Sequence, residues 1–362
     1  MPKILIIRHD NIGDLICVTP LIHALKKTLP DAEISAFVNS YNAPVLANHP
    51  DLDSLYYYTK AKHRKKNQSL FAVYWEKIKL IYTLRQQQFD FVILATPDPT
   101  QRLYQLAQWL APQKIILMRG QTNSPFKLSA NTIGVSRPLH FNELHEVERV
   151  FCLGEPIVKL TQKPSPVHIE VSKIQKAWAF QQIKKKGNCQ TSLNIGIHIS
   201  ARKKSQRWSV ENFVTLLTQL NHNNPKAQFL LFWSPGSEFH PQHPGDDEKA
   251  AAILAATKSL PIYPFRTQEL EELIAGLSLC DVLICSDGGA MHVGAGVGVP
   301  ILCFFGESDP KRWRPWGVPH VVLQSENQQV ALISPYTVIQ AFESLRAQFE
   351  QPRPSSKNEN ES

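Results

Sequence analysis

Through most of the chain, short apolar runs alternate with segments in which apolar residues recur every three or four positions. The runs predict buried strands of a parallel sheet, and the recurring positions predict amphipathic helices. Strands that alternate with helices in this way indicate an α/β fold built on doubly wound parallel sheets. The expected strands are Lys3–Arg8, Glu33–Val38, Ser54–Tyr58, Phe89–Ala95, Lys114–Met118, Leu193–Ile199, Gln228–Trp233, Leu260–Pro264, Asp281–Cys285, Val299–Phe304 and His320–Leu323.

The helices follow from the same pattern. Between Leu15 and Leu29 the helical spacing is interrupted by Pro20, so this helix is either kinked or begins again with Thr19 as its cap and Pro20 at its first position. The other expected helices are Leu70–Gln87, Thr100–Leu110, Asn142–Leu153, Lys173–Lys186, Val210–Asn221, Glu248–Thr257, Gln268–Leu279, Ala290–Gly298 and Pro335–Phe349.

The length of 362 residues predicts two domains. We expect residues 1–160 to form the first and residues 161–350 the second, because Glu155–Pro166 has the Pro-rich, polar composition of a linker. The last helix can pack back onto the first domain. Residues 351–362 are polar and lack apolar anchors, which predicts a disordered tail.

Composition and charge indicate a globular protein with acidic partners. Apolar residues make up 43% and charged residues 19%, which suits ordinary globular cores. The formal charge of +8 favours acidic partners, namely phosphorylated substrates, an anionic membrane or nucleic acid, without choosing among them. The apolar runs are too short to span a membrane, the first residues lead straight into a strand without a signal-peptide pattern, and the six cysteines form no CxxC pair. We therefore expect a protein of the reducing cytosol.

A glycine turn follows the apolar run Asp281–Cys285 and opens a helix of small residues. Such a turn points free backbone N–H groups and the positive end of a helix dipole at an anion, and glycine lets the backbone approach a ligand closely. His292 could donate to a phosphate, whereas Asp287 would cap the helix or accept from a ribose or sugar hydroxyl. The pattern suits a nucleotide-sugar diphosphate, although a ligand-free turn with an Asp cap remains the alternative. The donor-site candidates here are Ser286, Asp287, Gly288, Gly289 and His292.

Two further candidates also follow expected strands. Asp14 lies just beyond the first strand, where open α/β sheets place their ligand loops, and it could act as a base or simply cap a helix. The basic loop Ser200–Trp208 could bind phosphate or be a solvated surface. A second basic run, Lys60–Lys66, and the aromatic helix after it could touch an anionic lipid surface or the phosphates of a substrate, or be a solvated loop beside a core helix.

Several motifs resemble glycosyltransferase family 9, the bacterial lipopolysaccharide heptosyltransferases, from Lys3 to about Phe349. Gly13-Asp14 with Thr19-Pro20 is similar to the family's first loop. The C-terminal signature is matched by Asp287-Gly288-Gly289-Ala290-Met291-His292, Gly298-Val299-Pro300 and Phe305-Gly306-Glu307-Ser308-Asp309-Pro310.

The resemblance implies the GT-B architecture, two Rossmann-like domains facing each other across a cleft, with the acceptor in the first and the nucleotide-sugar in the second. It implies an enzyme that transfers heptose, with inversion, from ADP-heptose to the inner core of lipopolysaccharide, that is, to Kdo or heptose on lipid A. Asp14 would be the general base. The family's phosphate-binding Lys is replaced by Gln206, so Lys204 or Arg207 would supply that charge, and Glu248 would accept from the nucleoside.

The same resemblance sets expectations for cofactors and partners. No cofactor is required, no metal cluster is visible, and any divalent cation would be non-essential. The partners would be ADP-heptose, the anionic lipopolysaccharide core and the cytoplasmic surface of the inner membrane, with no nucleic acid. The location would be cytoplasmic, with peripheral contact to the inner face of that membrane allowed. The alternatives are another nucleotide-sugar donor or a non-catalytic nucleotide-sugar binder. A nicotinamide oxidoreductase is disfavoured because the first loop has only Gly13.

Overall fold

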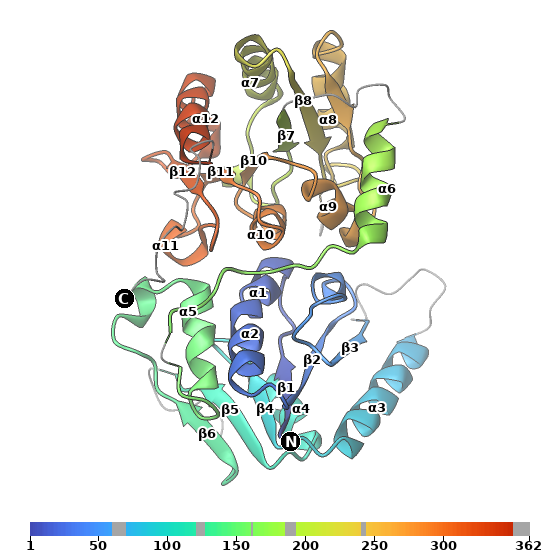
Figure 1. Ribbon diagram of the computed structural model, residues 1–362, viewed down its shortest axis with the longest axis vertical. Coiled ribbons are helices and arrows are strands. Elements are labelled where there is room, and N and C mark those ends of the chain that lie inside the picture. Colours follow the sequence, from blue (N-terminus) through green and yellow to red (C-terminus); the bar gives the residue numbers. More distant parts are fainter. Residues whose placement is uncertain (60–69, 121–126, 161, 185–192, 240–243, 350–362) are drawn as a thin grey trace, which may run out of the picture. The chain divides into compact units, whose positions relative to one another are not determined.

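The computed structural model describes residues 1–59, 70–120, 127–160, 162–184, 193–239 and 244–349, and it divides into two compact units (Figure 1). The first unit comprises Met1–Lys176, and the second begins at Ala177. Two later segments, Glu269–Ala275 and Asp309–Gly317, also belong to the first unit. The expected boundary near residue 160 therefore falls earlier than this division, and the chain passes between the units more than once. The expected tail lies outside the described residues.

The first sheet is parallel, with strand order β3-β2-β1-β4-β5-β6. The order reverses direction at β1, so the loop after β1 lies where open α/β sheets collect ligand-binding residues. All four residues Ile4–Ile7 of β1 are buried, as expected for a central strand covered on both faces. The strands are β1 Lys3–Ile7, β2 Glu33–Asn39, β3 Ser54–Tyr58, β4 Phe91–Leu94, β5 Lys114–Met118 and β6 Thr132–Val135.

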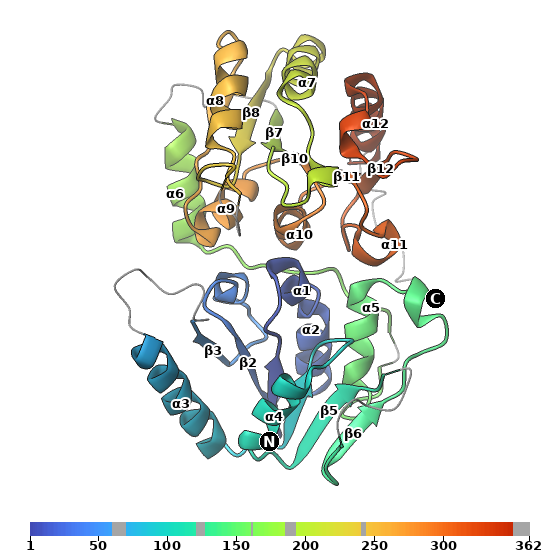
Figure 2. The same ribbon diagram turned by 180° about the vertical axis from the view of Figure 1, so that it is seen from behind.

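The second sheet is also parallel, with order β12-β11-β10-β7-β8-β9 (Figure 2). Its order reverses between β7 and β10, and the basic loop and the glycine turn leave the sheet at these two strands. The strands are β7 Leu193–His198, β8 Ala227–Phe232, β9 Ile262–Pro264, β10 Val282–Ser286, β11 Ile301–Phe305 and β12 His320–Gln324.

The helices complete the layers around the sheets (Figures 1 and 2). They are α1 Ile12–Ile16, α2 Thr19–Thr28, α3 Leu70–Gln86, α4 Gln101–Trp109, α5 Glu146–Phe151, α6 Lys173–Lys184, α7 Val210–Asn223, α8 Asp247–Ala256, α9 Leu270–Leu277, α10 Gly289–Gly296, α11 Pro310–Trp313 and α12 Pro335–Phe349.

The helix around Pro20 is not kinked. It ends as α1 and begins again as α2, with Val18 rather than Thr19 at the cap position. Pro20 lies in the first turn of α2, where its missing N–H costs no hydrogen bond. Thr19 instead donates its hydroxyl proton to the Ile16 carbonyl at 2.8 Å.

The prediction of a single helix over Asn142–Leu153 is wrong. The region contains two 3₁₀ turns, Phe141–Glu143 and Cys152–Gly154, with the short helix α5 between them. The backbone is extended at Leu144 and His145, so the first turn cannot continue into α5. His145 is the α5 N-cap, and its Nδ1 accepts from the Val147 N–H at 3.1 Å.

Helix α12 belongs to the second unit. It contacts α7, β11 and β12. Its Val338, Phe342 and Leu345 are fully buried in the core that also contains Trp208 and Phe213.

Candidate active site

Asp14 lies at the third position of α1, just beyond the central strand β1. Its Oδ2 accepts two hydrogen bonds from Asn11, one from the backbone N–H at 3.0 Å and one from Nδ2 at 2.9 Å. Its Oδ1 accepts from Arg8 Nη2 at 2.7 Å. A carboxylate has about four lone-pair positions, so one position on Oδ1 remains for a further donor. Asp14 thus takes part in the α1 cap and can still accept one further hydrogen bond.

Arg8 is the charge partner of Asp14, although no motif in the sequence indicates this role. It is 2% exposed, yet three carboxylates surround it: Asp10 at 2.9 Å, Asp14 at 2.7 Å and Glu146 at 3.0 Å. Burial opposes the charge on the guanidinium, but the three carboxylates outweigh it and raise its pKa. Arg8 is therefore a permanent cation beneath Asp14.

The glycine turn presents an open position at the start of α10. Gly288 is exposed, and no atom lies within 4 Å of the place where a Cβ would stand. Its φ of +157° is one that residues with side chains rarely adopt. The backbone N–H groups of an eight-residue helix can therefore be approached here by a ligand.

The other residues of this turn are more enclosed. Ser286 is buried and donates from Oγ to the Gln206 carbonyl at 2.7 Å. Asp287 is half-buried, and its N–H donates to the Phe304 carbonyl at 2.8 Å. His292 lies in the first turn of α10, as expected, but its ring is buried. Among these side chains, only Asp287 is not buried.

The two basic candidates differ in what they contact. Lys204 begins a 3₁₀ turn and is exposed. Arg207 is half-buried, donates from Nε to the Ala201 carbonyl at 3.0 Å, and its Nη1 lies 3.7 Å from Asp246 Oδ1. Lys204 is thus the more available of the two for a phosphate group.

At the start of α8, the enclosed acidic residue is Asp246 rather than Glu248. Glu248 is exposed, whereas Asp246 is the N-cap residue and 2% exposed, beside Arg207. Burial raises the pKa of Asp246, against a hydrogen bond from Ser200. Burial also lowers the pKa of Lys249 to about 8, and its Nζ donates to the Ile199 carbonyl at 3.0 Å.

The run Asp246-Asp247-Glu248 did not reveal which carboxylate would be enclosed, although an Asp directly before a helix is a strong cap signal.

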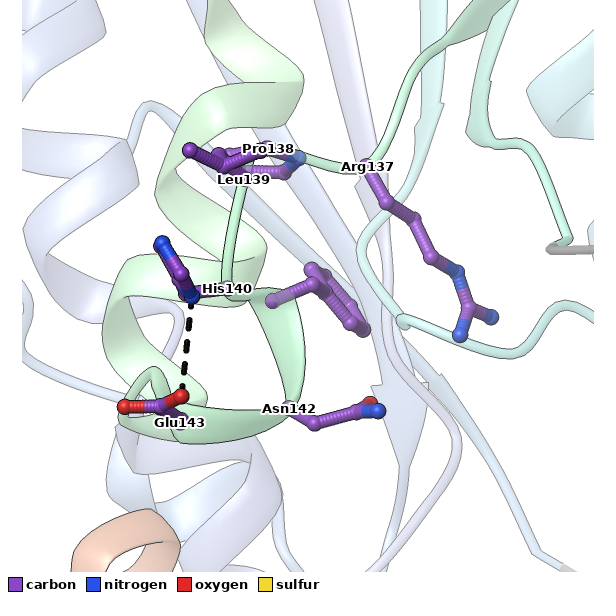
Figure 3. Close-up of a pocket in the computed structure, with 7 residues that line it drawn as sticks. Arg137, Pro138, Leu139, His140, Asn142 and Glu143 are labelled. Carbon is purple, nitrogen blue, oxygen red and sulfur yellow. Dashed lines mark ion pairs between the residues drawn. The ribbon is translucent and has the colours of Figure 1, made fainter.

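A separate surface pocket is lined by the continuous stretch Arg137–Glu143 (Figure 3). His140 Nδ1 lies 3.6 Å from Glu143 Oε1, and both side chains are exposed. Arg137 pairs instead with Asp98 at 2.6 Å. This pocket contains none of the candidate site residues. Over the parts of the chain that the structure describes, no cluster of three or more His, Cys, Asp or Glu side chains could hold a metal ion.

Comparison with known proteins identifies the class. Residues 77–334 match the model of glycosyltransferase family 9 (heptosyltransferase). The chain is 23% identical over 305 residues to lipopolysaccharide heptosyltransferase 3 of Escherichia coli K12, covering 84% of this chain and 82% of that relative.

Solved structures agree with this match. A glycosyl transferase family 9 structure from Veillonella parvula has a TM-score of 0.77 at 21% identity and covers 96% of this chain and 97% of its own. E. coli ADP-heptose lps heptosyltransferase II has a TM-score of 0.73 at 20% identity, covering 96% and 99%. The two parallel sheets with their helices are the GT-B fold, and the protein is a glycosyltransferase. The chain belongs to glycosyltransferase family 9, the heptosyltransferase family, which confirms the resemblance seen in the motifs.

Proposed function

We propose that this enzyme transfers heptose from ADP-heptose to the Kdo or heptose acceptor of the lipopolysaccharide inner core, with inversion at the anomeric carbon. The observation that carries the proposal is the orientation of Asp14, which is held on both oxygens and keeps one acceptor position on Oδ1. Named relatives support the choice of sugar, since they include lipopolysaccharide heptosyltransferases and an ADP-heptose heptosyltransferase.

In the proposed reaction, Oδ1 of Asp14 takes the proton of the acceptor hydroxyl. The acceptor oxygen then forms a bond to the anomeric carbon while the bond from that carbon to the diphosphate oxygen breaks. ADP leaves with the bonding electron pair. A positioned base of this kind typically contributes about 10²–10⁴ in rate.

The departing diphosphate is proposed to bind at the exposed start of α10. The N–H groups beside Gly288 and the helix dipole favour the negative charge that develops there, and the exposed Lys204 adds a mobile cation. Asp287 is proposed to accept a hydrogen bond from a hydroxyl of the sugar or ribose. Asp246 is proposed, in place of Glu248, as the acidic residue that contacts the nucleoside. No step of this proposal requires a cofactor, and a divalent cation would be non-essential.

The lipid-linked acceptor implies a membrane partner, and we assign its contact to the outer face of α3. Trp75, Ile78 and Tyr82 are each more than half exposed at helical spacing, with the exposed cations Lys79 and Arg85 among them. Aromatic side chains interleaved with cations are typical of helices that lie on anionic lipid surfaces.

The opposite face of α3 packs on the first sheet through the buried Leu84 and through Lys77, which lies over the Tyr58 ring. No helix in the described ranges is long and apolar enough to cross a membrane. We propose a cytoplasmic location with peripheral contact to the inner face of the inner membrane. The Lys60–Lys66 run lies outside the described residues.

The test is ADP release by the purified chain with ADP-heptose and a deacylated core acceptor, beside a panel of other ADP- and UDP-sugars. Release that requires both ADP-heptose and acceptor supports the proposal. Turnover only with another nucleotide-sugar would show that the enzyme uses that donor instead of ADP-heptose. Tight ADP-heptose binding without turnover, equal in Asp14→Asn, would instead indicate a non-catalytic binder.

A further inference from the structure

Glu146 is a carboxylate with no exposure to solvent, and it lies between two guanidinium groups. Its Oε1 accepts from Arg8 Nη2 at 3.0 Å. Its Oε2 accepts from Arg312 Nε at 3.0 Å and lies 2.8 Å from Arg312 Nη2. A buried charge is tolerated only when it is paired and hydrogen-bonded, and here both oxygens are occupied. Glu146 is therefore held in one orientation.

Arg8 connects Glu146 to Asp14. Its Nη2 donates to both Asp14 Oδ1 and Glu146 Oε1, its Nη1 donates to the Ala95 carbonyl, and its Nε lies 2.9 Å from Asp10 Oδ2. Nη1 and Nη2 thus donate hydrogen bonds within the protein, whereas Nε has the charge contact with Asp10 but no hydrogen-bond partner among the described residues. Arg8 is suited to hold the carboxylates in place rather than to bind a substrate phosphate.

Arg312 comes from the segment Asp309–Gly317, which belongs to the first unit although it lies late in the chain. Three further contacts hold this segment. His145 Nε2 is hydrogen-bonded to the Arg314 carbonyl at 2.8 Å, and Trp316 Nε1 donates to the Ser165 carbonyl at 2.9 Å. The ring centroids of His145 and Trp316 lie 4.7 Å apart. Arg312 therefore reaches Glu146 from an anchored backbone.

We propose that Glu146 and Arg312 are positioning residues for the base: they fix Arg8 and, through it, the direction of the open acceptor position on Asp14 Oδ1. The inference rests on the proposed function of Asp14. Three carboxylates share two guanidiniums in this cluster. When Arg312 is removed, Glu146 Oε2 loses its donors and competes with Asp14 for Arg8, so Oδ1 turns away from the acceptor hydroxyl.

The kinetic test compares Glu146→Gln and Arg312→Gln with wild type. The matched control is Glu143→Gln, which replaces an exposed acidic residue of the same loop region whose Oε1 lies 3.6 Å from His140 Nδ1 (Figure 3). We expect kcat to fall about tenfold or more in both cluster variants, up to the contribution of about 10²–10⁴ that a general base typically makes. The KM for the donor should stay within about twofold, because the donor contacts proposed at α10 are unchanged. Arg312→Lys should recover part of kcat.

A readout without substrate separates this inference from the proposed function. The carboxyl ¹³C signal of Asp14, assigned as the one missing in Asp14→Asn, should shift in Arg312→Gln and stay fixed in Glu143→Gln. If wild type shows no transfer, the proposed function fails while this signal still decides the positioning role. Arg312 is partly exposed, so Arg312→Gln carries the test if Glu146→Gln does not fold. An unchanged Asp14 signal, or a kcat equal to wild type in Arg312→Gln, overturns the inference.

Discussion

The Gln206 side chain donates a hydrogen bond of 2.7 Å to Asp287 Oδ2 and a second of 3.1 Å to Ser308 Oγ. Gln206 is 4% exposed. The amide satisfies the Asp287 carboxylate but adds no positive charge beside it. Under the proposed function, charge stabilisation of the donor would therefore depend on the exposed Lys204 and on the start of α10.

Replacing Gln206 by methionine should destabilise the second unit. The similar volume preserves packing, but Asp287 and Ser308 lose a buried donor, which costs about 1–3 kcal/mol. The expected fall in melting temperature is about 2–4 °C per kcal/mol for a unit of this size. Gln340→Met is the control, because the Gln340 amide also donates a hydrogen bond but is exposed. Equal melting temperatures for the two variants would show that the Gln206 bonds contribute nothing.

Asp14→Asn and Asp10→Asn form a matched pair, since both carboxylates contact Arg8. Asp14→Asn should lower kcat by about 10²–10⁴, the loss of a general base. Asp10 is about half exposed and contacts Nε of Arg8 rather than Nη2, so Asp10→Asn should lower kcat by less than about tenfold. Steady-state ADP release measures both. Comparable losses in the two variants would mean that the charge around Arg8, and not a base at Asp14, controls the rate.

The local pattern of apolar residues predicts most of the strands and helices, because a buried parallel strand appears in the sequence as a short apolar run. Strand β6 was missed since Thr132–Val135 is short, only partly buried and lies at the edge of its sheet. The broken region around α5 was missed because the extended backbone at Leu144 interrupts a pattern that otherwise looks helical.

For the candidate site too, some residues could be predicted from the sequence and others could not. Asp14 could be placed from the end of the first strand, and the donor turn from its glycines. The Arg8–Glu146 pair joins residues 138 positions apart, so no local spacing indicates it. Arg312 lies further still along the chain, and only the packing of its segment beside α5 brings it to Glu146.

Lys249 should give the second unit a distinctive response to alkaline pH. Burial lowers its pKa from 10.5 to about 8, against the opposing charge of Asp246. Between these values the unfolded chain binds more protons than the folded protein, so the free energy of unfolding contributed by Lys249 rises from pH 8 towards 10.5. Lys249→Met lacks this gain. In urea unfolding, the free energy of unfolding of wild type should therefore increase relative to that of Lys249→Met as pH rises.

The control for this pH effect is Lys258→Met, which replaces an exposed lysine just beyond the end of α8. Its difference from wild type should not change with pH across the same window. A constant difference between wild type and Lys249→Met would show that Lys249 is charged equally in the folded and unfolded states.

The outer face of α3 should bind anionic vesicles. Wild type is expected to sediment with vesicles that contain phosphatidylglycerol and to be released by high salt, because part of the attraction is electrostatic. Burying a large apolar side chain contributes about 1.5–3 kcal/mol, so replacing Trp75 and Tyr82 together by serine should weaken partitioning at least tenfold even after partial insertion is allowed for.

Tyr336→Ser is the matched control for this face. Tyr336 is 69% exposed on α12, compared with 64% for Tyr82 on α3, but it belongs to the second unit. Its vesicle binding should equal that of wild type, and ADP release from a deacylated, water-soluble acceptor should be unchanged in all three proteins. If the α3 variant bound vesicles as well as Tyr336→Ser did, this face would not be the membrane contact. A loss of turnover on the soluble acceptor would instead mean that α3 supports the acceptor site itself.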